Sequence, residues 1–141
     1  MTVYNLYIFD QRGVCVYYHE WTKTKQGEKP SENETKLLHG MLIGLKRFIG
    51  KISPSETVVT RFSYSTNTYR LHFYESPTMI KIVLNTDNAC APVHEELETV
   101  FRIYTKFVSQ NPFCVSAESV DSQLFTSMLD SYIQSLQIFK K

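Results

Sequence analysis

The sequence predicts an α/β (α+β) domain in which a five-stranded, mainly antiparallel sheet carries helices on both faces. Two strand-like segments come first, at residues 3–10 and 14–21, and an amphipathic helix follows. Three further strand-like segments lie at residues 56–65, 67–75 and 79–87, and two helical patterns end the chain. The predicted order is therefore ββ-α-βββ-α-α. The chain of 141 residues has no internal linker, so we expect one domain over residues 1–141.

The first two segments are expected to form a β-hairpin. Both are rich in β-branched and aromatic residues, and the intervening DQRG at residues 10–13 is typical of a turn. Gly13 supplies the backbone freedom that such a turn needs. The polar segment at residues 23–30 that follows the hairpin carries Gly and Pro and is expected to be a loop.

The first helix is predicted to begin near residue 32, because Ser31 and Glu34 form a capping-box pattern. Gly50 and Pro54 are expected to bracket its end. Its apolar positions follow helical spacing and form one stripe, which consists of Leu37, Leu38, Met41, Leu42, Leu45, Phe48, Ile49 and Ile52.

The three middle strands have short connections, so an antiparallel meander is predicted. Neither face of the hairpin at residues 69–87 is fully polar, which favours helices over both faces of the sheet. Pro92 is expected to begin the second helix, and the Asn-Pro sequence at residues 111–112 is expected to end it. A third helix is predicted from Val120 to Leu136.

Composition excludes several functional classes. A net charge of +1 and a lysine-containing loop without aromatic residues argue against nucleic-acid binding. Three cysteines without a CxxC pair indicate a reduced, intracellular protein without a metal cluster. The first ten residues do not resemble a signal peptide, and no apolar run reaches the length of a membrane span.

Catalytic motifs are also missing, so no catalytic, cofactor-binding or metal-binding residues are predicted, and no cofactor is expected. One cluster deserves a test. By strand alternation His72 and Tyr74 share a face with Arg70, and Lys81 on the next strand is expected near them. This leaves open a ligand-binding or enzymatic domain centred on His72 and Tyr74, although a structural role for His72 is favoured because no orienting partner completes the site.

The first helix offers a candidate partner interface at Gly40, Gly44, Lys36, Ile43 and Arg47. Glycine within a helix costs about 1 kcal/mol relative to alanine, so two glycines four residues apart indicate close approach of another backbone. That backbone belongs either to the domain's own sheet or to a partner. In helical projection the basic residues lie largely away from the apolar stripe; they are Lys36, Lys46, Arg47 and Lys51. They form either a solvated face or a contact with an acidic partner or an anionic membrane.

Several segments together resemble one protein family. These are MTVYNLYIFDQRGVCVYYHEW at the start, KLLHGMLIGLKRF in the first helix, YRLHFYESPTMIKIVLNTD in the middle hairpin and LFTSMLDSYIQSL near the end. They resemble the small longin-type core subunits of TRAPP, the transport protein particle, and within this family the smallest subunit. The resemblance implies a longin-like fold with one helix on one face of the sheet and two on the other.

The resemblance also implies a function. TRAPP core subunits assemble with one another, and the assembly acts through a composite surface as an exchange factor for a Rab GTPase of the Rab1/Ypt1 type. The chain is therefore expected to be a non-catalytic subunit that supports vesicle tethering and transport from the endoplasmic reticulum to the Golgi. It is expected in the cytoplasm, peripherally associated with Golgi and endoplasmic reticulum membranes through the complex. A longin-type small subunit of another trafficking machine, such as a clathrin adaptor, is the alternative.

Overall fold

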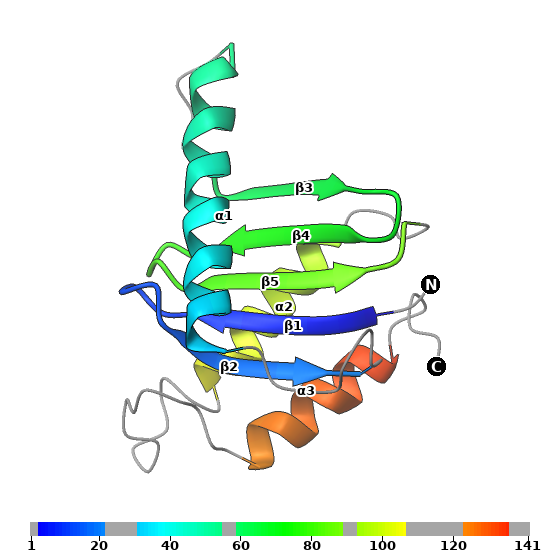
Figure 1. Ribbon diagram of the computed structural model, residues 1–141. Coiled ribbons are helices and arrows are strands. Elements are labelled where there is room, and N and C mark those ends of the chain that lie inside the picture. The colour runs from blue at the N-terminus through cyan, green and yellow to red at the C-terminus, as the bar shows by residue number, and fades with distance from the viewer. Residues whose placement is uncertain (1–2, 22–30, 55–58, 89–92, 107–122, 136–141) are drawn as a thin grey trace.

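The computed structural model describes residues 3–21, 31–54, 59–88, 93–106 and 123–135. Within them the chain forms five strands and three helices in the predicted order (Figure 1). The strands are β1 (Val3–Phe9), β2 (Cys15–Glu20), β3 (Arg61–Ser65), β4 (Arg70–Glu75) and β5 (Lys81–Thr86). The helices are α1 (Glu32–Ile52), α2 (His94–Tyr104) and α3 (Gln123–Ser135).

The five strands form one sheet in the order β2-β1-β5-β4-β3, and all four pairings are antiparallel. The meander of β3, β4 and β5 is confirmed, and β5 joins it to the first hairpin by pairing with β1. Consequently β2 and β3 are the two edges of the sheet. The third strand begins at Arg61, later than the predicted residue 56.

One helix covers one face of the sheet and two helices cover the other, as Figure 1 shows. The cluster beneath α1 contains Phe9, Leu42, Phe62, Leu71, Phe73 and Val83. The larger cluster against α2 and α3 includes Leu6, Ile8, Ile82, Leu84, Leu97, Val100, Phe125, Leu129 and Ile133. Because successive side chains of a strand point to opposite faces, each central strand supplies both clusters. The predicted layer arrangement is confirmed.

Helix α1 begins as its sequence predicts. The Ser31 hydroxyl accepts a hydrogen bond from the Glu34 N–H at 3.2 Å, and the Glu34 carboxylate accepts one from the Ser31 N–H at 3.4 Å. The helix ends at Ile52, between Gly50 and Pro54 as predicted, and the N–H of the following Ser53 donates to the Ile49 carbonyl. The predicted loop at residues 23–30, the Pro92 start of α2 and its predicted end at residues 111–112 lie outside the described residues, as do Cys90 and Cys114.

Candidate functional site

The segment of β4 that contains His72 and Tyr74 was the candidate for chemistry. The His72 side chain is fully buried, and its Nε2 lies 2.9 Å from the hydroxyl of Thr86 on β5. Lys81 shares the parity of Val83 and lies on the α1 face, whereas Tyr74 packs on the opposite face with α2 and α3. The expectation that Lys81 approaches His72 is therefore wrong, because strand alternation separates them. The His72 imidazole is therefore enclosed in the core, with the Thr86 hydroxyl as a neighbour.

An ion pair between Lys46 of α1 and Glu75 of β4 joins the helix to the sheet. The Lys46 ammonium contacts both carboxylate oxygens of Glu75, the more distant one at 3.0 Å, and the two side chains are 24% and 7% exposed. Lys81 lies directly opposite Glu75 in the strand register, and its Nζ donates to the Met79 carbonyl at 3.3 Å. The expectation that Lys46 lies on a face directed to solvent or to a partner is wrong, since Lys46 follows the buried Leu42 by one helical turn and contacts the domain's own sheet.

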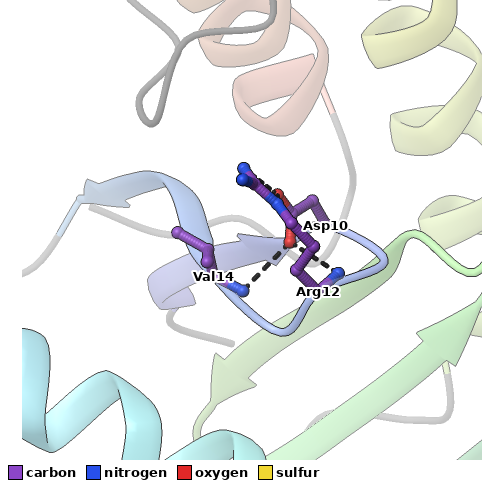
Figure 2. A network of polar contacts seen from close by, with 3 residues as sticks. All are labelled: Asp10, Arg12 and Val14. Carbon is purple, nitrogen blue, oxygen red and sulfur yellow. Dashed lines mark hydrogen bonds and ion pairs between the residues drawn. The ribbon is translucent and has the colours of Figure 1, made fainter.

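The turn between β1 and β2 is held by the Asp10 carboxylate (Figure 2). One oxygen accepts from the backbone N–H groups of Arg12 and Val14 at 2.9 and 3.0 Å, and the other accepts from the Arg12 guanidinium. Burial opposes ionisation, but these bonds outweigh it and hold the pKa of Asp10 below its usual value.

The same turn packs against α1. Gly13 adopts a φ of 83°, and a Cβ there would lie 2.7 Å from the His39 ring. Burial of that ring lowers the pKa of His39. Because its pKa is lowered, the His39 ring is neutral at neutral pH. The ring lies directly over Gly13, and a side chain on residue 13 would displace it.

The opposite side of α1 is apolar and bare. We define the outer face of α1 as Leu37, Gly40, Met41, Gly44, Phe48 and Ile52. Its four large side chains are exposed by 74% at Leu37, 43% at Met41, 59% at Phe48 and 65% at Ile52. At about 100° per residue they lie within about 60° of one another on the helix. A Cβ at Gly40 or Gly44 would meet nothing within 4 Å among the described residues, so these glycines do not serve packing against the domain's own sheet.

The length of α1 explains part of this exposure. With 21 residues the helix is about 31 Å long, whereas the axes of five strands span only about 19 Å. Helix α1 crosses the strands and its C-terminal turns extend beyond the edge strand β3 (Figure 1). Phe48 and Ile52 belong to these last turns, so the sheet offers no cover for them.

The basic residues lie to one side of the outer face. Lys36 and Arg47 are exposed, whereas Ile43 is half-buried. The Lys36 ammonium lies 3.2 Å from the carboxylate of Glu32 in the preceding turn. In helical projection Arg47 and Lys51 border the glycine side of the outer face, while Lys36 and Ile43 lie further round the helix. Of the five predicted interface residues, the two glycines and Arg47 thus adjoin the bare apolar surface.

The sequence did not predict that Leu37, Met41, Phe48 and Ile52 are exposed, because their helical spacing assigned them to the apolar stripe. The structure divides that stripe: Leu42 is buried, and Leu38, Leu45 and Ile49 are half-buried against the sheet. The excess of helix length over sheet width was the signal that some of the stripe must remain uncovered.

Within the described ranges, no three His, Cys, Asp or Glu side chains are grouped so that they could hold a metal ion. The Cys15 Sγ lies 3.4 Å from the Tyr17 carbonyl oxygen. Among the described helices, none combines the length and the apolar character that a membrane span requires.

Comparison with known proteins places the chain in a family. A model of the Sybindin-like family matches residues 3–136. "Trafficking protein particle complex subunit 1" of Rattus norvegicus is 45% identical over 140 residues, which cover 99% of this chain and 97% of the rat protein. The protein of the same name in Homo sapiens is 44% identical with the same coverage.

A solved structure of the gliding protein MglB from Thermus thermophilus aligns with a TM-score of 0.47 and 14% identity, over 63% of this chain and 64% of the MglB chain. The family assignment does not depend on that alignment, since the sequence relatives match over nearly the full length. The resemblance to the small longin-type TRAPP subunits is confirmed, and the chain belongs to the Sybindin-like family.

Proposed function

We propose that this chain is a non-catalytic core subunit of the TRAPP tethering complex and that the outer face of α1 is one of its contacts with another subunit. The name of its relatives, trafficking protein particle complex subunit 1, supports the assembly. The single observation that carries the contact is the bare apolar surface with two open glycines. Large exposed apolar patches with polar surroundings are typical of protein–protein contacts.

Burial of this face would contribute a useful free energy. Complete burial of one large apolar side chain stabilises by about 1.5–3 kcal/mol. The four side chains of the outer face are 43–74% exposed, so covering them contributes on the order of 4 kcal/mol. That is about half of the free energy of a micromolar contact. The remainder would come from the rest of the interface.

The candidate interface comprises Gly40, Gly44, Lys36, Ile43 and Arg47, to which the apolar residues of the outer face are now added. The glycines allow a partner backbone to approach closely, since they carry no side chain. Arg47 and Lys36 provide charge at the border, where exposed ion pairs set orientation more than affinity.

Through this assembly the chain contributes to nucleotide exchange on a Rab GTPase and to transport from the endoplasmic reticulum to the Golgi. Exchange requires a surface that binds the nucleotide-free GTPase more tightly than the nucleotide-bound form. Such a surface needs no acid–base residue, which agrees with the buried, structural position of His72. The complex also accounts for peripheral association with Golgi and endoplasmic reticulum membranes.

The test is assembly in cells. Tagged chain carrying Phe48→Ser and Ile52→Ser should recover less of the other TRAPP subunits, as measured by quantitative mass spectrometry. The matched control is Met128→Ser on α3, which is 42% exposed but lies on the other helical layer. The purified complex containing the variant should also exchange nucleotide on the Rab GTPase more slowly.

Three outcomes separate the alternatives. Loss of TRAPP subunits with the double variant but not with the control supports the proposal. Recovery of clathrin-adaptor subunits by the unmodified chain would instead assign it to that machine. Recovery of the unmodified chain alone, as a monomer, would refute the assembly role.

A further inference from the structure

A row of polar side chains crosses strands β2, β1 and β5 on the face of the sheet that carries α1. Asn5 of β1 lies opposite Glu20 of β2 on one side and opposite Asn85 of β5 on the other. Asn5 shares the parity of Phe9, which packs beneath α1. Helix α1 crosses the end of the sheet where β1 finishes, so Asn5, near the start of β1, lies beyond the helix (Figure 1). We define the polar row as Asn5, Tyr18, Glu20 and Asn85.

Hydrogen bonds join the polar row from strand to strand. The Asn85 Nδ2 donates to the Asn5 Oδ1 at 2.8 Å, and the Tyr18 hydroxyl donates to the Glu20 Oε2 at 2.7 Å. A further side-chain hydrogen bond links Asn5 to Tyr18. Burial raises the pKa of Tyr18, and the hydrogen bond to the Glu20 carboxylate raises it further. The four side chains therefore form one connected network.

Two atoms of this network are enclosed without a hydrogen-bond partner. They are the Glu20 Oε1 and the Asn85 Oδ1, and neither has a partner among the described residues. Both atoms can only accept, so each requires a donor. Tyr18 cannot supply one to the Glu20 Oε1, because its single O–H is directed at Oε2. Since enclosed polar atoms in folded proteins are nearly always paired, two unpaired acceptors in one network indicate that donors come from another molecule.

The donor at Glu20 should carry a positive charge. The ion pairs of the described part of the chain do not include Glu20. Burial raises the pKa of the neighbouring Tyr7 to about 12, and Cys15, Glu34 and Glu20 add to this effect, so the surroundings are negative. An ammonium or guanidinium group carries donors and no acceptor, and it binds a carboxylate oxygen more strongly than a neutral donor does.

The spacing of the two acceptors favours a polypeptide over a small cation. Glu20 and Asn85 belong to the two strands that flank β1, so their backbones lie two strand spacings apart, or about 10 Å. A peptide segment with one basic side chain and a second N–H or O–H donor spans such a separation, whereas a metal ion or a single ammonium group does not.

We propose that the polar row binds a basic side chain of another TRAPP subunit, with the cation at the Glu20 Oε1 and a second donor of the same segment at the Asn85 Oδ1. This inference rests on the proposed subunit role and adds a contact on the sheet that is separate from the outer face of α1. The contact also provides specificity, because a partner with an apolar or acidic residue at this position would leave the Glu20 Oε1 unpaired.

The first experiment measures assembly in cells. Glu20→Gln keeps the size of the side chain and an oxygen for the Tyr18 hydroxyl, but it removes the charge. It should lower the recovery of one neighbouring TRAPP subunit by about tenfold, because a charge-assisted hydrogen bond is lost. The control is Glu95→Gln, which neutralises an exposed glutamate on α2 and should leave recovery unchanged. The isolated Glu20→Gln chain should melt at a temperature similar to that of the unmodified chain, since no cation within it is lost.

A cryo-electron microscopy map of the assembled complex then identifies the occupant. The expected feature is a lysine or arginine of another subunit within about 4 Å of the Glu20 carboxylate. Exchanging the two charges, with Glu20→Lys in this chain and glutamate in place of the partner's cation, should restore the recovery that either change alone removes. A cation of this same chain, or of a second copy of it, at that position would overturn the inference.

The remaining outcomes separate this contact from the subunit role. If Phe48→Ser with Ile52→Ser reduces assembly while Glu20→Gln does not, the subunit role stands and the inference is wrong. If the isolated Glu20→Gln chain melts at a clearly lower temperature and all subunits are lost equally, the polar row only stabilises the fold, which would also overturn the inference. If the unmodified chain recovers no TRAPP subunit, the subunit role and the inference fail together.

Discussion

Replacing Gly40 and Gly44 together by alanine should stabilise this chain while weakening its assembly. Each new Cβ enters open space in the described structure, so no clash opposes the gain. Alanine within a helix is about 1 kcal/mol more favourable than glycine, which gives about 2 kcal/mol for the pair. The unfolding entropy of a chain of 141 residues is about 300 cal/mol/K, so the melting temperature should rise by about 7 °C.

The same two methyl groups would stand on the outer face of α1, where the partner backbone is proposed to approach the glycines. Overpacking of a fitted contact costs about 1–3 kcal/mol, so affinity for the neighbouring subunit should fall by about tenfold. Thermal unfolding of the purified chain measures the first effect, and quantitative recovery of TRAPP subunits measures the second. Gly50→Ala is the control: its Cβ would meet only the Val59 Cγ2 at 3.8 Å, an ordinary contact, and Gly50 is not part of the outer face.

Two results would refute this reasoning. A fall in the melting temperature of the Gly40, Gly44 variant would mean that the glycines are needed inside the folded chain. A rise in melting temperature with undiminished assembly would mean that no partner packs closely over these glycines. Only the combination of a more stable chain and a weaker complex agrees with the proposal.

Three further predictions concern the folded chain. Gly13→Ala should lower the free energy of unfolding by about 2 kcal/mol in urea titrations, because residue 13 has a positive φ and its Cβ would strike His39; an unchanged midpoint would contradict this. The lowered pKa of Asp10 stabilises the fold at pH values above the unfolded pKa near 3.8, and this contribution disappears as the pH falls through the lower folded pKa. Asp10→Asn should therefore make the free energy of unfolding depend less on pH in the acid range. Glu75→Ala should lower the free energy of unfolding by about 2–3 kcal/mol in the same titrations, because it leaves the partly buried Lys46 without its carboxylate. Adding Lys46→Met should restore most of this loss. No recovery would show that packing at residue 75 dominates.

Much of the fold could be predicted from local patterns. The capping box at Ser31 and Glu34 located the start of α1, because both its hydrogen bonds join residues three apart in the chain. The apolar character on both parities of β4 and β5 predicted helices on both faces of the sheet, which the two clusters confirm. Gly13 was expected at a turn and has the positive φ that such a turn uses.

The candidate site was less predictable. Lys46 was expected on a face of α1 directed to solvent or to a partner, yet it contacts Glu75, a residue 29 positions further along the chain. Lys81 was expected beside His72, but the register that pairs Lys81 with Glu75 puts it on the opposite face. Both errors concern the relation between elements, which depends on sheet register and helix position.

By itself, the sequence determined which segments are strands and helices, their order, and the presence of two glycines within an amphipathic helix. These properties follow from periodicity and capping within a few residues. Only the tertiary structure decided which half of the α1 stripe is covered. A helix of about 31 Å extends beyond a sheet only about 19 Å wide, which leaves Phe48 and Ile52 in its last turns without cover. Leu37 and Met41 are exposed because they share the side of the helix that is turned away from the sheet.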